Sequence, residues 1–182
     1  MTEFSSSATF VAPFRVRSYE LDGLGHLNHA VFLNYLEQAR FDALAAGGFP
    51  IETMEDRGWG VHVVRIEIDY RRECRFGDHI IARTFVENFR NTSMTIHQAL
   101  YRFRPGLPAT ETDAPPASMP ELAGPMRLDD AVALNLDAAE LAAEARVVAV
   151  WVGSDGKPMR IPEEVREALR PPERPPPSRG GA

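Results

Sequence analysis

The sequence predicts an α+β domain in which an antiparallel sheet is wrapped around one long buried helix. Two observations predict this class. Only one stretch of the 182 residues has the length and apolar spacing of a long helix, and the stretches after it are rich in Val, Ile, Thr and aromatic residues with short connections. Strands joined so closely are antiparallel, and a sheet that covers a single apolar helix buries the apolar faces of both.

The first predicted strand is Ala8–Tyr19, in which alternate residues, among them Phe10 and Phe14, are apolar. Alternation with a period of two is typical of a half-buried strand. Pro13 has no backbone N–H and therefore indicates an edge position or an early bulge. A glycine-rich turn then ends the pattern.

The predicted helix spans Ala30–Ala46, with Asn28 as its N-cap and Gly47-Gly48 after its last turn. Its apolar residues recur every three or four positions and extend around most of its circumference. A helix that is apolar on nearly all sides is enclosed rather than lying on a surface. We therefore expect this helix to be buried at the centre of the domain.

Three long runs after the helix have strand character: Trp59–Tyr70, Asp78–Asn91 and Thr92–Arg104. A short connection over Ile51–Gly58 precedes them, and a further strand is expected over Val147–Val152, with Leu141 as its earliest start. The sheet would then have four or five antiparallel strands after the helix. One edge of such a sheet stays open, and pairing with a second copy of the chain would cover it.

Residues 105–140 interrupt the β pattern with six prolines and an excess of acidic residues, so we expect an acidic loop insertion, with a short helix near Asp129–Leu136. A C-terminal helix is predicted over Pro162–Leu169, because proline is favoured in a first helical turn. Pro171–Ala182 is rich in Pro, Arg and Gly and is predicted to be disordered. The chain should therefore form one domain over residues 1–170, followed by a tail over 171–182.

Composition excludes several functional classes. The net charge is −6, from 20 basic and 26 acidic residues, which argues against a general nucleic-acid binder. No stretch has the length of a membrane span, and the first residues lack the basic start and apolar core of a secretory signal. Cys74 is the only cysteine, so an intrachain disulfide is impossible. We expect a cytoplasmic protein with neither membrane nor nucleic-acid partners.

The most informative stretch runs from Tyr19 to His29 and brings a carboxylate, two glycines, two histidines and an asparagine to the entrance of the predicted helix. A helix N-terminus presents free backbone N–H groups and the positive end of the helix dipole. A carboxylate there can lie beside a hole for a developing negative charge, which is what hydrolysis of an acyl compound needs. Asp22 is either a catalytic carboxylate or a turn-forming cap, and residue type alone leaves both open.

Other candidate sites are less specific. Glu37, inside the helix, is either paired with Arg40 or a second catalytic carboxylate. His26 and His29, with Asp22 four residues before His26, have some of the spacing of a metal site, but no third strong ligand accompanies them, and we expect neither a metal nor another cofactor. The sequence contains neither Gly-x-Ser-x-Gly nor a phosphate-binding Gly-x-x-x-x-Gly-Lys-Ser/Thr.

The whole frame around this entrance resembles the 4-hydroxybenzoyl-CoA thioesterase family of hotdog-fold acyl-CoA thioesterases. It reads Tyr19-x-x-Asp22-x-x-Gly25-His26-x-Asn28-x-Ala30-x-Phe32-x-x-Tyr35-x-Glu37-x-Ala39-Arg40. The resemblance continues through Ile68-Asp69-Tyr70, Gly77-Asp78 and Arg146–Trp151, and covers most of residues 10–170 apart from the insertion. It implies the hotdog fold and the hydrolysis of an acyl-CoA, or of an acyl carrier protein thioester, to a free carboxylic acid without a cofactor.

The resemblance also implies roles for single residues. Asp22 would attack the thioester or activate the attacking water, with His26 and Asn28 orienting the reacting groups. A backbone N–H at His29 or Ala30 would polarise the carbonyl. Sites in this family lie between subunits of a homo-oligomer, either a dimer or a tetramer, and basic surface residues meet the CoA phosphates. The candidate substrate-binding residues are Glu37, Tyr70, Arg71, Arg72, Arg75, Arg90, Thr92 and Ser93, with Thr92 and Ser93 reaching the site from the opposing subunit.

The sequence departs from the family frame at His29, where relatives often have a second asparagine, and at Phe32, where they often have tyrosine. Two other functions stay open: a non-catalytic acyl-CoA-binding module of the same fold, and a dehydratase acting on hydroxyacyl thioesters. Asp22 and His26 favour the hydrolase over the binding module, because a pure binder has no use for a carboxylate beside the thioester. A dehydratase would need a His/Asp or His/Glu pair in another arrangement.

Overall fold

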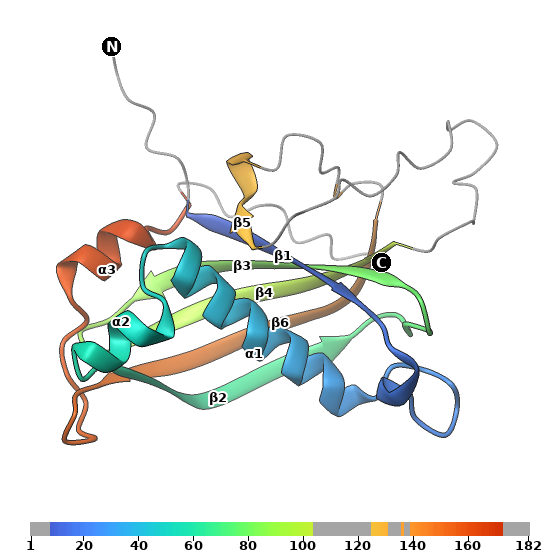
Figure 1. Cartoon of the computed structure of the whole chain (residues 1–182), viewed down its shortest axis with the longest axis horizontal. Coiled ribbons are helices and arrows are strands. Elements are labelled where there is room, and N and C mark those ends of the chain that lie inside the picture. The colour runs from blue at the N-terminus through green and yellow to red at the C-terminus, as the bar shows by residue number, and fades with distance from the viewer. Residues whose placement is uncertain (1–7, 104–124, 131–135, 137–138, 173–182) are drawn as a thin grey trace, which may run out of the picture.

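The computed structural model describes residues 8–103, 125–130, 136 and 139–172, which form a curved six-stranded antiparallel sheet with three short-to-medium helices (Figure 1). The order of strands across the sheet is β2-β6-β4-β3-β1-β5. The strands are β1 (Thr9–Arg15), β2 (Gly60–Tyr70), β3 (His79–Phe89), β4 (Ser93–Phe103), β5 (Met126–Arg127) and β6 (Glu140–Val152). The helices are α1 (His29–Ala46), α2 (Ile51–Asp56) and α3 (Glu163–Ala168).

The antiparallel sheet that the sequence predicts is present, and most differences lie at the ends of elements. β6 begins at Glu140, beside the earliest expected start. β1 ends four residues before Tyr19, because the chain turns into a short 3-10 segment over Ser18–Glu20. The expected connection Ile51–Gly58 is largely α2. The expectations for residues 105–140 and for the tail fall mostly outside the described residues. Of the insertion, the structure describes only β5, a 3-10 turn over Leu128–Asp130 and isolated positions.

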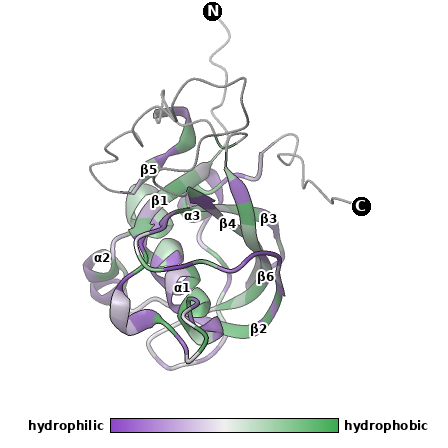
Figure 2. Cartoon of the chain, turned by 90° about the vertical axis from the view of Figure 1, so that its right-hand side faces the viewer, coloured by the Kyte–Doolittle hydropathy of each residue, from purple (hydrophilic) through white to green (hydrophobic). Residues whose placement is uncertain are grey.

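α1 lies along the inner side of the curved sheet and packs against β1 and β3 (Figures 1 and 2). Asn28 caps the helix, because its Oδ1 accepts a 2.9 Å hydrogen bond from the backbone N–H of Ala30. The buried residues all lie on one side: Phe32, Tyr35, Leu36, Ala39, Ala43 and Leu44.

The opposite side of α1 is exposed, and Phe41 on that side is 45% exposed. The expectation of a helix enclosed on nearly all sides is therefore wrong for a single chain. The physical reason is that α1 covers one part of the sheet only. The inner face of the middle of β2 is left uncovered, and Val63 and Ile66 there are 41% and 37% exposed.

A buried polar contact fixes α1 against the centre of the sheet. Gln98 on β4 is fully buried, and its amide donates to the carbonyl of Leu36 at 2.9 Å and to Oγ1 of Thr84 on β3 at 3.0 Å. Its Oε1 accepts a 2.8 Å hydrogen bond from the guanidinium of Arg40. Buried amides need such partners, so these bonds set the position of α1 along the sheet.

Candidate active site

Asp22 is fixed in a tight turn directly before α1. Leu21 and Leu27 form an antiparallel bridge that closes the turn, and the N–H of Asp22 donates to the carbonyl of His26 at 2.8 Å. Gly25 has a φ of 75°, a backbone conformation that favours glycine. The turn thus holds the Asp22 side chain in one place.

The carboxylate of Asp22 is held by backbone groups of its own turn. Oδ1 accepts hydrogen bonds from the N–H of Leu24 at 2.8 Å and of His26 at 3.1 Å. The bond from Leu24, followed by that from His26, keeps the pKa of Asp22 below its usual value. Asp22 is consequently ionised at neutral pH, and its second oxygen has no such backbone donor in the described structure.

Glu20 anchors this turn to the body of the protein. Its carbonyl accepts from the N–H of Asn28 at 2.9 Å, and its carboxylate, in a residue only 8% exposed, accepts from the hydroxyl of Tyr35 at 2.6 Å and from the N–H of Arg17 at 2.7 Å. Burial, and next the bond to Glu20, raises the pKa of Tyr35. The ring of Tyr35 stacks on Phe14 at 4.8 Å. Sequence reasoning missed Glu20, and its only local signal is its place two residues before Asp22.

The entrance of α1 contains one N–H that is free to donate. The N–H of Ala30 is taken by Asn28, whereas the N–H of His29 has no acceptor among the residues that the structure describes. The carbonyl of His29 accepts a 3.0 Å hydrogen bond from the hydroxyl of Tyr70, whose ring meets Phe32 edge-on at 5.3 Å. Asn28, His29, Ala30 and Tyr70 therefore come together at this entrance.

One arginine of the β2–β3 connection reaches the same place. Nη2 of Arg75 lies 3.4 Å from Nε2 of His26, and the backbone N–H of Arg75 is fixed by Asp78 at 2.8 Å. Arg71 instead pairs with Asp69 and Glu144, at 3.5 and 3.6 Å.

Other predicted residues lie elsewhere in a single chain. Arg72 is exposed and donates to the carbonyl of Arg71. Arg90, Thr92 and Ser93 form the β3–β4 turn, which is separated from the β2–β3 connection by the whole of β3, about 35 Å at the usual rise per strand residue. Glu37 is exposed on α1, about 12 Å beyond His29 along the helix axis.

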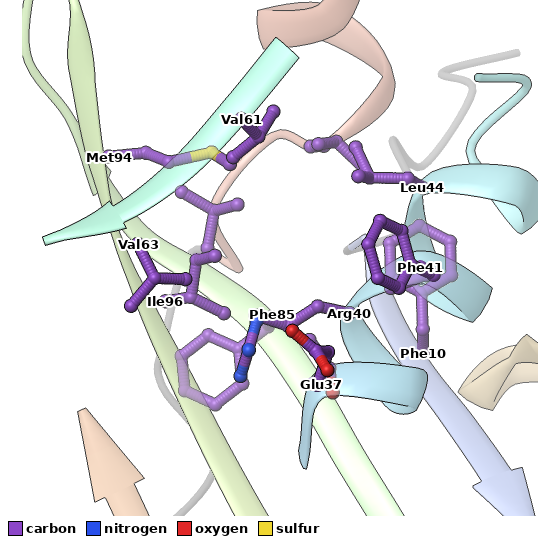
Figure 3. Close-up of a pocket in the computed structure, with 14 residues that line it drawn as sticks. Phe10, Glu37, Arg40, Phe41, Leu44, Val61, Val63, Phe85, Met94 and Ile96 are labelled. Atoms are coloured by element: carbon purple, nitrogen blue, oxygen red, sulfur yellow. The ribbon is translucent and has the colours of Figure 1, made fainter. Parts of the chain in front are cut away.

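A cavity lies beyond Glu37, between α1 and strands β2, β3 and β4 (Figure 3). The cavity and the open solvent at its mouth together contain about 590 Å³ of empty space. Its walls are mainly apolar, and the polar side chains among them are Glu37, Arg40 and Thr84.

Two other features are absent from the described part of the chain. There, no three His, Cys, Asp or Glu residues are grouped so that they could hold a metal ion. No helix within the same ranges has the length and apolar character needed to cross a membrane.

Comparison with known proteins identifies the family. The model of the thioesterase-like superfamily matches residues 16–169. FadM of Escherichia coli, a long-chain acyl-CoA thioesterase, is 30% identical over 86 residues, which are 47% of this chain and 64% of FadM. The chloroplastic acyl-acyl carrier protein thioesterase ATL3 of Arabidopsis thaliana is 21% identical over 152 residues, 84% of this chain and 63% of ATL3. The chain thus spans less than two thirds of the length of each of these relatives.

The fold also resembles that of a solved thioesterase structure. A crystal structure of a 4-hydroxybenzoyl-CoA thioesterase variant in complex with 4-hydroxybenzoyl-CoA superimposes with a TM-score of 0.68 and 15% identity, over 90% of this chain and 99% of that one. At this identity the likeness shows the fold alone. From the family match over residues 16–169 and the superposition together, the chain belongs to the thioesterase-like superfamily of hotdog-fold proteins.

Proposed function

We propose that the protein hydrolyses an acyl-CoA to a free carboxylic acid and CoA at the turn before α1, with Asp22 as its catalytic carboxylate. One observation carries this proposal: an ionised carboxylate fixed by two backbone N–H groups stands in the turn that leads into the free N–H of His29. An acyl carrier protein thioester is the alternative substrate, since one of the relatives described above is named for that activity.

The proposed reaction has two steps. A carboxylate oxygen of Asp22 attacks the thioester carbon, the carbonyl oxygen takes up the negative charge beside the N–H of His29, and the C–S bond breaks to release the CoA thiolate. Water then attacks the Asp22 carboxyl carbon of the mixed anhydride, which returns the Asp22 carboxylate with one oxygen from water and releases the acid. The alternative route is general-base attack, in which the Asp22 carboxylate accepts a proton from a water that attacks the thioester carbon.

The two routes differ in where the oxygen of water goes. In a single turnover in ¹⁸O-water, attack by Asp22 places the first ¹⁸O atom in the enzyme's carboxylate. Label that appears in the product acid at once, with none in Asp22, would contradict the proposed second step, because general-base attack and water attack on the acyl carbon both put the label there.

Neighbouring side chains position the substrate in this proposal. Arg75, beside His26 and exposed, would meet a phosphate of CoA, and the arginine fork suits such bidentate contacts. His26 would orient the attacking group or the water. Asn28 acts by capping α1, which leaves the N–H of His29 as the donor to the carbonyl.

We also propose a homo-oligomer, a dimer or a dimer of dimers. Among the strands that the structure describes, β2 is an edge strand of 11 residues, paired only with β6, and it carries Val64 with 60% exposure. Pairing this edge with a second copy, and covering the exposed side of α1, would make α1 the enclosed central helix of the assembly. Arg90, Thr92 and Ser93 would then have a route to the partner's site. Val64→Lys should shift the sedimentation mass towards the monomer, and an unchanged mass would argue against this edge.

A thiol-release assay on short, long and aromatic acyl-CoAs tests the function against its rivals. The proposal predicts stoichiometric release of CoA thiol and free acid. Tight binding of an acyl-CoA without release would favour the binding module. Loss of water from a hydroxyacyl-CoA, with the thioester intact, would favour the dehydratase.

A further inference from the structure

We propose that the cavity beside α1 receives the far end of a long, unbranched acyl chain and thereby selects substrates by chain length. This inference rests on the thioester hydrolysis proposed above, because it takes the entrance of α1 as the place of the thioester carbon.

The chemistry of the cavity suits a saturated chain. Phe41, Leu44, Val61 and Met94 are among its apolar walls (Figure 3). Of the polar groups, Arg40 and Thr84 are hydrogen-bonded to Gln98, which leaves Glu37 on the exposed side of α1. An apolar occupant is therefore favoured over a charged one.

An apolar path joins the cavity to the entrance of α1. Tyr70, Ile66 and Val63 lie on the same face of β2, because their partners on β6 are Ala143, Val147 and Ala149, all in the core on that side of the sheet. These three side chains are 46%, 37% and 41% exposed. Tyr70 contacts His29 at one end of the path, and Val63 lines the cavity at the other. One extended ligand can thus occupy both places.

The spacing along α1 sets the length of that ligand. At about 1.5 Å per residue, Glu37 lies about 12 Å and Phe41 about 18 Å beyond His29. An extended chain of tetrahedral and planar carbons advances about 1.2 Å per bond, as in an extended backbone. A chain of about 10 carbons therefore reaches the rim of the cavity, and one of about 14 to 16 carbons enters it. Shorter chains and a single aromatic ring stop before the rim.

The test is the chain-length dependence of kcat/KM for thiol release, with C4 to C16 acyl-CoAs and benzoyl-CoA below their micelle concentrations. Each buried methylene should raise kcat/KM about fourfold, so the value should rise about 10²-fold between C10 and C14. Thiol release without this rise, or fastest with benzoyl-CoA or C8 and shorter chains, overturns the inference and leaves the hydrolase. No thiol release from any thioester overturns the proposed hydrolysis itself.

A matched pair of variants locates the chain. Phe41→Glu places a charge in the cavity lining, so it should lower the C14-to-C4 ratio of kcat/KM at least 10-fold. Ala45→Glu adds the same charge to an exposed position of α1 outside the cavity lining and should leave the ratio unchanged. Equal ratios in the two variants, with native circular dichroism, would contradict the proposal; Phe41→Ala provides a second variant if Phe41→Glu does not fold.

Discussion

Replacing Tyr35 by phenylalanine tests how the turn that carries Asp22 is anchored. The change removes one hydroxyl, which donates a 2.6 Å hydrogen bond to Glu20, and both residues are more than nine-tenths buried. A hydrogen bond to a charged group contributes about 1.5–3 kcal/mol, and its loss leaves a buried carboxylate oxygen without that donor. The stacked ring on Phe14 is retained. We expect the free energy of unfolding to fall by about 1.5–3 kcal/mol.

Urea unfolding at a fixed protein concentration measures this loss, since oligomers have concentration-dependent stability. In a chain of this size the same loss corresponds to a fall in Tm of about 3–12 °C. Tyr19→Phe is the matched control, because Tyr19 is 75% exposed and should change stability by less than about 0.5 kcal/mol. If Tyr35→Phe were as stable as the control, the Glu20–Tyr35 bond would not anchor the turn.

Two further predictions concern the same turn. Gly25→Ala forces a side chain into a φ of 75° with open space around it, so it should lower the free energy of unfolding by about 1–2 kcal/mol and also lower kcat. Gly23→Ala is the control and should change neither quantity. Urea unfolding and thiol release measure the two quantities, and equal behaviour of the two variants would refute the strain argument. The pH dependence follows from Asp22, which must be ionised: activity is present above its pKa and is lost as the pH falls through it. Because that pKa lies below its usual value, the acid limb of kcat/KM should be centred below about pH 4, and a limb centred above about pH 5 in folded protein would contradict the assignment.

The sequence was informative where local rules decide structure. Alternation predicted the long strands, and the N-cap Asn28 and the glycines after residue 46 placed the helix within one residue of its observed start. The sequence could not predict that one side of α1 is exposed in a single chain. Apolar residues on all sides of a helix indicate that it is covered, but they do not indicate whether the same chain or a second copy covers it. Phe41 is such a residue.

In the candidate site, too, the sequence predicted the contacts within one short segment and missed those between distant segments. The residues from Asp22 to Ala30 are close in sequence, so their proximity follows from a single turn and cap. Glu20 and Tyr35, 15 residues apart, meet only because the 3-10 segment Ser18–Glu20 and the second turn of α1 pack together. Arg75 could not be distinguished from Arg71 or Arg72 in sequence, because the choice depends on how the β2–β3 connection folds back on His26. The cavity depends on the gap between α1 and β2, to which no sequence pattern corresponds.

The catalytic role of Asp22 is tested most directly by thiol release from Asp22→Asn, which keeps the shape and an acceptor for the N–H groups of Leu24 and His26 but removes the charge. Asp42→Asn, on the same helix as the cavity residues, provides a matched control for the loss of one carboxylate. The account predicts that Asp22→Asn retains native circular dichroism and loses about 10²–10⁴-fold in kcat, while the control keeps its activity. Full activity of Asp22→Asn on the best acyl-CoA would contradict the account.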